Sequence, residues 1–256
     1  MSFTNKVIKK VKDTSKRGVL LSLCPVYYQY REKCENFWKG NHPQYGKVEG
    51  FEVARFRYFH TNADRYEKTG GMVILGFNPS GAYLSTKSKL RNGTIGTPSA
   101  FYEYDPFENG PIAIDPYTRA VEQFAADCGY ADNQYKLDAF GIVEKTQSGL
   151  ENKILKNPSL YEPVFELAIS AIIKLEPKIV VFANAGLRRL IIDNGLFKNT
   201  ITQLTWNSRD CVYNMFLKDQ DNNSIRCNAL FTTMLAGGHL DKGSRETIVQ
   251  VIKNIP

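Results

Sequence analysis

The sequence has few cysteines and no long apolar run, and each shortage excludes a class of protein. The five cysteines are spread along the chain, and no two of them form a C-x-x-C pair. An odd count without paired spacing argues against a disulfide scaffold and against a zinc knuckle, and reduced cytosolic thiols fit it best. No apolar run approaches the roughly 20 residues that a membrane helix needs. We therefore expect a cytoplasmic protein without a membrane partner, a metal or a disulfide framework.

Net positive charge is also small outside the amino-terminal segment. The formal net charge of the 256 residues is +7. Residues 1–17 hold six Lys or Arg against one Asp, which leaves only +2 for the rest of the chain. A basic arm of this kind binds nucleic-acid phosphates, and a solvated leader or helix face has the same composition. The basic balance is therefore mostly a property of this tail.

The chain does contain a short apolar run that ends in a polar turn. Residues 72–75 are apolar without alternation, which is typical of a strand buried on both faces. The run stops at Gly76, and Pro79 keeps Asn78 away from helical dihedral angles. A buried parallel strand that ends in such a turn delivers it to the carboxyl edge of an α/β sheet, where these folds bind ligands. Asn78 is therefore the first candidate site residue.

Further strands and helices alternate along the chain. Helices are predicted over 27–39, from Pro116 onwards, over 158–176 and over 244–255; strands are predicted over 137–143 and 178–183, and as a hairpin over 212–217 and 225–232. This order predicts an α/β fold, a three-layer α/β/α sandwich with a mainly parallel central sheet. We assign residues 61–256 to this domain and residues 1–60 to a basic amino-terminal extension and helix.

A long irregular stretch, residues 80–114, follows the first strand. It contains several Gly and Pro residues together with an aromatic cluster between Phe101 and Phe107. Stretches of this length inside a compact domain are usually functional. The aromatic rings suit stacking on a flat ligand, and they would equally serve to pin the loop to the core.

Three segments share a pattern with a known family. Val73–Ser80 is a strand followed by Gly-x-Asn-Pro, Glu176–Ala185 is a helix end, a Pro and a second apolar strand, and Leu230–Glu246 is a strand, a loop and a closing helix. Together they resemble the uracil-DNA glycosylase superfamily, and most closely its mismatch-specific uracil/thymine branch. The resemblance covers most of residues 70–255 and implies a uracil-DNA glycosylase-like fold.

The resemblance implies a DNA-repair hydrolase that cleaves the N-glycosidic bond of a flipped damaged or mismatched base such as uracil, without metal or cofactor. In that branch the Asn of the first motif, here Asn78, orients the attacking water, because an amide does not accept a proton near neutral pH. His239 and Leu240 are the nearest matches to the donor and the apolar wedge of the last loop. The remaining substrate-binding residues implied are Gly76, Phe77, Pro79, Ser80, Phe101 and Tyr104.

The sequence departs from the family in its last loop and its second strand. The family loop carries His or Asn followed by Pro-Ser, whereas residues 236–242 place His239 a few positions later. The strand around Asp138 lacks the Asn that many relatives use to read the pyrimidine edge, and the clustered cysteines of the iron–sulfur branches are absent. A second hypothesis is therefore a catalytically inactive nucleic-acid or nucleotide-binding module of the same fold.

A third hypothesis is an unrelated α/β hydrolase-like enzyme. It would use His239 with Asp241 or Asp115 as the acid–base pair. The sequence has no evident Gly-x-Ser-x-Gly turn to supply the nucleophile for such an enzyme.

Overall fold

The computed structural model describes residues 69–77, 116–141, 146–235 and 239–255, together with seven residues between 26 and 37. Those seven residues are all helical, in agreement with the helix predicted over 27–39. The basic segment 1–17, the stretch 80–114 and the residues from Asn78 to Ser80 lie outside the described residues.

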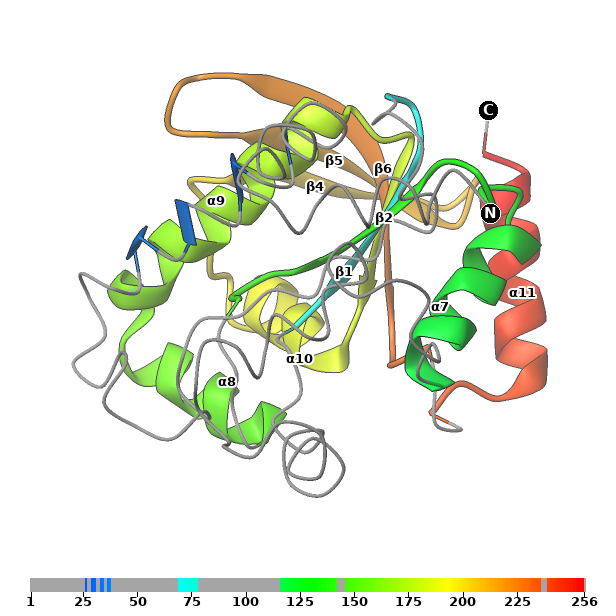
Figure 1. Cartoon of the computed structure of the whole chain (residues 1–256), viewed down its shortest axis with the longest axis horizontal. Helices are drawn as coiled ribbons and strands as arrows, with labels where there is room; N and C mark the ends of the chain where they lie inside the picture. The colour runs from blue at the N-terminus through cyan, green and yellow to red at the C-terminus, as the bar shows by residue number, and fades with distance from the viewer. Residues whose placement is uncertain are drawn as a thin grey trace, which may run out of the picture.

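A six-stranded sheet in the order β2-β1-β3-β6-β5-β4 forms the centre of the fold (Figure 1). Its strands are β1 (Met72–Gly76), β2 (Gln134–Asp138), β3 (Ile179–Ala183), β4 (Ile201–Asn207), β5 (Val212–Lys218) and β6 (Ser224–Thr232). β1 and β3 are neighbouring parallel strands with Val73 opposite Val180. The predicted α/β class is therefore confirmed, and the two predicted apolar strands are neighbours in the sheet.

The prediction of a mainly parallel sheet is wrong, because the sheet is mixed. β2, β1, β3 and β6 run parallel, whereas β5 pairs antiparallel with both β6 and β4. The β5–β6 hairpin follows from local turn chemistry: Asp219 Oδ1 accepts hydrogen bonds from the backbone N–H groups of Asp221 and Asn223. β4 was not predicted, since most of its residues are exposed and no apolar run marks it.

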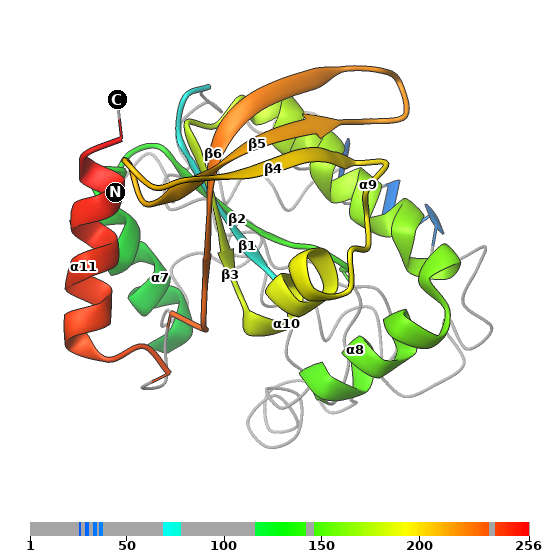
Figure 2. The same ribbon diagram turned by 180° about the vertical axis from the view of Figure 1, so that it is seen from behind.

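The helices are α7 (Pro116–Asp127), α8 (Gln147–Lys156), α9 (Pro158–Leu175), α10 (Ala185–Arg188), which continues into the π-helical turn η2 (Arg189–Asp193), and α11 (Lys242–Lys253). α7 and α11 lie side by side on one face of the sheet, and α8, α9 and α10 lie on the other (Figures 1 and 2). α7 and α9 confirm the two helices predicted there; α9 begins with Pro158 at its first turn and ends at Glu176, whose φ is 43°. α8 was not predicted.

Alternate residues of the central strands supply two separate cores. Val73, Leu75 and Phe182 pack with α8, α9 and α10 in a first core. Met72, Ile74 and Val181 pack with α7 and α11 in a second core. Because both faces of these strands are buried, they need apolar residues at every position, which is why they read as unbroken apolar runs.

Candidate functional site at the carboxyl edge of the sheet

The parallel strands end together, and their last residues form a row across the sheet. Asp138 lies opposite Gly76, and Ala183 lies opposite Thr232. Leu75 lies opposite Phe182, which places Gly76 beside Ala183 in the next position. We call Asp138, Gly76, Ala183 and Thr232 the edge row. It has two small residues at its centre and a polar side chain at each end.

Among the described residues, one buried oxygen at each polar end of the edge row has no hydrogen-bond partner. The side chain of Asp138 is 2% exposed; its Oδ1 accepts from Lys136 Nζ at 3.1 Å, and its Oδ2 meets no donor in the described part of the chain. Thr232 is 9% exposed, and the same holds for its Oγ1. Leaving a buried polar atom unpaired costs about 1–3 kcal/mol. Two such atoms at the ligand-binding edge of an α/β sheet are therefore candidates for contacts with a ligand.

Gly76 is required at its position by its neighbour in β2. A Cβ atom at Gly76 would collide with Asp138 Oδ1. The glycine that opens the Gly-x-Asn-Pro turn thus also makes room for the carboxylate. The first motif and Asp138 are parts of one arrangement, although 62 residues separate them in the sequence.

The opposite face of the same edge is tied together by hydrogen bonds between helices. Asn184 Oδ1 accepts from the N–H of Gly186 at 2.7 Å and caps α10, while its Nδ2 donates to Gln147 Oε1 at 2.8 Å. Glu151 in α8 accepts from both Nε and Nη2 of Arg189, a contact that raises the pKa of Arg189. These contacts hold α8 against α10 and support the strand ends from behind.

Phe77 occupies the core and is not exposed to a ligand. It is 2% exposed and packs edge-on against Phe140, with 5.3 Å between ring centres. The expected site residues Asn78, Pro79, Ser80, Phe101 and Tyr104 lie outside the described residues. Of the first motif, the structure therefore describes Gly76 in the edge row and Phe77 beneath it.

The described residues of the last loop, 239–241, make contacts within the fold. His239 is exposed, and its carbonyl accepts a hydrogen bond from Thr233 Oγ1 at 3.0 Å. Leu240 is partly buried against the second core. Asp241 caps α11: its Oδ1 accepts from the N–H of Ser244 at 2.9 Å, and its Oδ2 accepts from Ser244 Oγ.

These contacts weigh against an acid–base pair of His239 and Asp241. Both carboxyl oxygens of Asp241 are used by the helix cap, and the hydrogen bonds from Ser244 lower the pKa of this carboxyl. Asp115, the other partner considered, lies outside the described residues. The hydrolase-like reading has no support among the described residues.

The two unpaired oxygens of the edge row were not predicted from the sequence. A signal for Asp138 does exist, because Lys136 and Asp138 alternate with the buried Tyr135 and Leu137 in a short strand. Two ionisable residues on one face of a strand indicate a polar environment or a buried ion pair. Thr232 carries no comparable signal, since Thr is common in strands.

Thiol chemistry and metal binding find little support in the described part of the chain. Burial raises the pKa of Cys128 and of Cys227 to about 12, so both stay protonated near neutral pH and neither is a nucleophile. Across residues 69–77, 116–141, 146–235 and 239–255, no group of three or more His, Cys, Asp and Glu side chains is placed to hold a metal ion.

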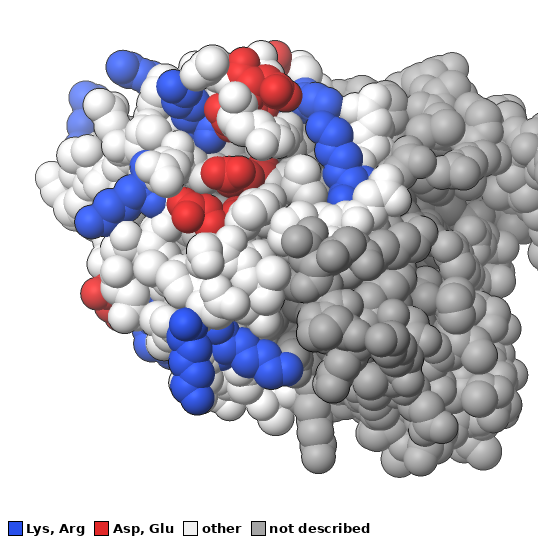
Figure 3. Space-filling view, turned by 90° about the vertical axis from the view of Figure 1, so that its left-hand side faces the viewer, with Lys and Arg blue, Asp and Glu red and all other residues white. Residues whose placement is uncertain are grey.

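Surface charge does not form one patch on the described surface in Figure 3. Lys and Arg side chains are spread over the described part of that face, and Asp and Glu side chains lie among them. Because charges of both signs are mixed there, the face drawn in Figure 3 gives no reason to expect contacts with nucleic-acid phosphates.

No helix among the described residues is long and apolar enough to cross a membrane.

No family model matches the sequence, and no curated protein matches it. The geometry of the site and the motif resemblance therefore remain as the grounds for a function.

Proposed function

We propose that this protein is a DNA glycosylase-like hydrolase of the uracil-DNA glycosylase fold that binds a flipped, uracil-like base at the edge row. The observation that carries the proposal is the buried Oδ2 of Asp138, an acceptor that meets no donor among the described residues and lies beside the glycine of the Gly-x-Asn-Pro turn. Every base that pairs in DNA offers hydrogen-bonding groups on one edge, and a flipped base loses its pairing partner. A buried acceptor at the site replaces that partner.

The dimensions of the edge row suit a base together with its sugar. Asp138 and Thr232 stand on strands that are separated by three strand spacings, which is about 14 Å at about 4.8 Å per spacing. A single pyrimidine ring is too short to contact both, whereas a nucleoside extends far enough. The space above Gly76 is taken by the carboxylate of Asp138, and Ala183 beside it carries only a methyl group.

A carboxyl oxygen selects the donor groups of a base. In its ion pair with Lys136, the carboxylate of Asp138 accepts hydrogen bonds and donates none. It therefore favours the ring N–H of uracil or hypoxanthine, or an exocyclic amino group, over a carbonyl at the same place. Thr232 Oγ1 both donates and accepts, so it tolerates either kind of group at the other end.

The reaction requires only water beyond the DNA. The water oxygen bonds to the sugar carbon, the C–N bond breaks with its electron pair going to the base, and the water proton passes to solvent or to the departing base. Asn78, which directly follows Phe77, would accept a hydrogen bond from this water and orient it. The sugar gains positive charge in the transition state, and fixed dipoles aimed at that charge lower the barrier.

Base release from synthetic oligonucleotides tests this proposal. Duplexes and single strands that contain uracil, hypoxanthine or mismatched thymine are incubated with the protein, and abasic sites are counted after alkaline cleavage. Asn78→Ala is expected to lower turnover by about 100-fold or more with little change in DNA binding, because oriented water acts mainly in the transition state. Asp138→Asn replaces one acceptor by a donor at nearly the same shape, so the preferred base should change.

The matched control for these variants is Asp193→Asn, which removes an exposed carboxylate beyond α10. It is expected to leave the rate and the base preference unchanged. Wild-type base release that Asn78→Ala and Asp138→Asn both leave intact would remove the edge row from the reaction, and with it this proposal.

A second candidate is a binding module that holds a nucleotide or a nucleic acid without cleaving it. The exposed side chain of His239 and the use of Asp241 as a helix cap favour it, because the last loop then brings no described acid–base group to the edge row. This candidate predicts no base release even when protein equals DNA in amount. It also predicts retained binding of single-stranded or damaged DNA that Asp138→Asn weakens.

A further inference from the structure

The antiparallel part of the sheet presents a polar surface that the edge row does not use. Gln203, Phe216 and Arg226 lie opposite one another across β4, β5 and β6. Thr205, Asn214 and Asn228 form the next row on the same face, because residues two apart in a strand point to the same side. We call these six residues the polar sheet face. They line a hollow of about 370 Å³ together with Met215 and Cys227.

The other side of these strands is packed, so the polar sheet face is the free side. Met215 is buried in the first core, and Leu204 and Cys227 pack against that core from the intervening positions. Gln203, Thr205, Asn214 and Arg226 are exposed, and Phe216 is half-buried. α11 covers the same face only farther along, where Val212 and Leu230 join the second core.

The composition of this face is not the one that sheet stability favours. Asn is depleted in strands, whereas β-branched and aromatic residues are enriched, and the difference spans about 1 kcal/mol per position. Asn214 and Asn228 nevertheless face each other in the two central positions. Among the described residues, the side chains of Gln203, Thr205 and Asn214 make no hydrogen bond, so their donors and acceptors are free. Asn228 Nδ2 donates to the backbone carbonyl of Lys178 at 3.3 Å and so serves the fold. Stability does not account for the other three amide and hydroxyl side chains gathered around one aromatic ring.

The charge of the polar sheet face is positive. Arg226 lies over the ring of Phe216, with its Cζ atom 5.7 Å from the ring centre, and it has no described carboxylate partner. No Asp or Glu lines the hollow. A planar guanidinium beside an aromatic ring offers both a flat stacking surface and a phosphate contact.

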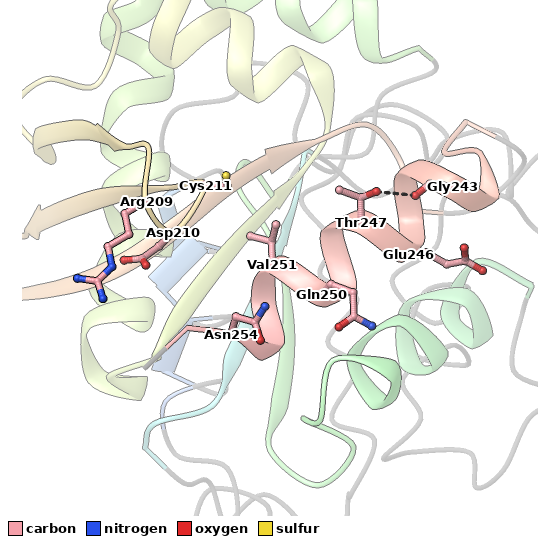
Figure 4. Close-up of a pocket in the computed structure, with 9 residues that line it drawn as sticks. All are labelled: Arg209, Asp210, Cys211, Gly243, Glu246, Thr247, Gln250, Val251 and Asn254. Atoms are coloured by element: carbon pink, nitrogen blue, oxygen red, sulfur yellow. Dashed lines mark hydrogen bonds between the residues drawn. The ribbon is translucent and has the colours of Figure 1, made fainter.

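The neighbouring hollow on the same side lacks these properties. It lies between the β4–β5 turn and α11, with a volume of about 970 Å³ (Figure 4). Its lining mixes Arg209 with Asp210 and Glu246 and contains no aromatic residue. Glu246 points away from the turn in Figure 4, and Val251 points toward it. This second hollow therefore shows no preference for an anion or for a flat ring.

We propose that the polar sheet face binds a segment of single-stranded nucleic acid. The bases stack on Phe216 and on the guanidinium plane of Arg226, which also contacts a phosphate, and the amides of Asn214 and Gln203 bond to the base edges. The positive charge of the face is complementary to a phosphate backbone. The face is three β-strands wide, which leaves room for a segment of single-stranded nucleic acid laid across β4, β5 and β6. This binding is independent of cleavage at the edge row.

Fluorescence anisotropy with a labelled mixed-sequence DNA strand of about 15 nucleotides tests the proposal on the full chain. Phe216→Ala is expected to weaken binding by about 10-fold, since each stacked base contributes about 1–3 kcal/mol. Arg226→Ala is expected to weaken binding. It should also make the negative slope of log affinity against log salt concentration shallower by about 0.7. Arg226→Lys should keep that slope but lose part of the affinity, because the ammonium group does not stack.

Lys198→Ala is the matched control, since it removes one exposed cation from the loop before β4, next to Phe197 of the first core. It should leave the affinity unchanged. Thermal unfolding of each variant separates lost contacts from lost folding. The proposal is overturned if the wild-type protein does not bind the labelled DNA, or if Phe216→Ala and Arg226→Ala bind it with wild-type affinity. It is also overturned if polyglutamate displaces the labelled DNA as well as unlabelled DNA of the same sequence does.

The test of strand binding and the test of base release can fail independently of each other. Loss of strand binding in Arg226→Ala without any base release by wild type would support this surface and overturn the glycosylase. Base release that depends on Asn78, together with strand binding indifferent to Arg226 and Phe216, would do the reverse.

Discussion

The parallel and antiparallel halves of the sheet differ in how many of their faces are buried. In the parallel half, β1 and β3 are buried at every position between two layers of helices. In the antiparallel half, β4 and β5 pack one face against the first core. Their other face is the polar sheet face, which is open to solvent. Phe182 of β3 is 0% exposed, whereas Gln203, Thr205 and Asn214 of the polar sheet face are exposed.

This contrast separates positions that hold the fold from positions that are free to bind. The parallel half has no spare face, so a ligand can meet it only at the strand ends, where the edge row lies. The antiparallel half has a free face, so a ligand can lie across the strands themselves. Substitutions should therefore cost much stability in the first half and little in the second.

The largest effect is expected from a matched pair of phenylalanines. Phe182→Ala removes a fully buried ring that stacks on Phe231 with 4.5 Å between centres, and it should cost about 4 kcal/mol of unfolding free energy. Phe216→Ala removes a half-buried ring from the polar sheet face and should cost about 1 kcal/mol. Urea unfolding of both variants measures the difference. Equal costs would show that the two halves do not differ as described.

An intermediate effect is expected at the turn that fixes the antiparallel half to α9. Asp219 accepts from the N–H groups of Asp221 and Asn223, from Asn223 Nδ2 and from Ser170 Oγ in α9. Asp219→Ala leaves these donors unpaired and should cost about 3 kcal/mol. Urea unfolding of the variant measures this cost, and a loss below about 1 kcal/mol would contradict the assigned role of the turn.

The same residue makes a pH-dependent prediction. Burial alone would raise the pKa of Asp219, but the hydrogen bonds from Asn223, Ser170 and Asp221 outweigh it, and the pKa is lowered. A lowered pKa in the folded state gives stability that is complete above the unfolded pKa of about 3.9 and is lost as pH falls through the folded value. Wild type should therefore exceed Asp219→Asn in stability at pH 7, and the gap should shrink below about pH 4. A gap that stays constant down to pH 2 would contradict the assignment.

The smallest effect, and the sharpest test of the comparison, is expected at Asn214. Asn214→Thr exchanges a poor strand former for a good one on the free face and should raise the unfolding free energy by up to about 0.5 kcal/mol. The same change should weaken binding of single-stranded DNA, because it removes an amide from the polar sheet face. A variant that loses stability and keeps its affinity would indicate that Asn214 serves the fold.

The turn at Asp219 and the runs at 72–76 and 179–183 were predictable because their causes are local. An unbroken apolar run requires burial on both faces, and an Asp-Asn-Asn sequence supplies its own turn hydrogen bonds. β4 was not predictable, because its polar, exposed residues pair only with β5, and that pairing exists only once the hairpin has formed. The mixed character of the sheet was missed for the same reason.

The sequence by itself determined the two central strands at 72–76 and 179–183, the β5–β6 hairpin, and the residue, Gly76, that ends the first strand. It placed the strand predicted over 137–143 a few residues too late, since β2 is Gln134–Asp138, and only the tertiary structure decided what lies beside Gly76. Strand order places Asp138 against Gly76 and Thr232 against Ala183, and packing among the described residues leaves one buried oxygen unpaired at each end of the row. Hydrophobic patterning reports whether a residue is buried, but a hydrogen-bond partner is a matter of distance and direction, which only the assembled sheet fixes.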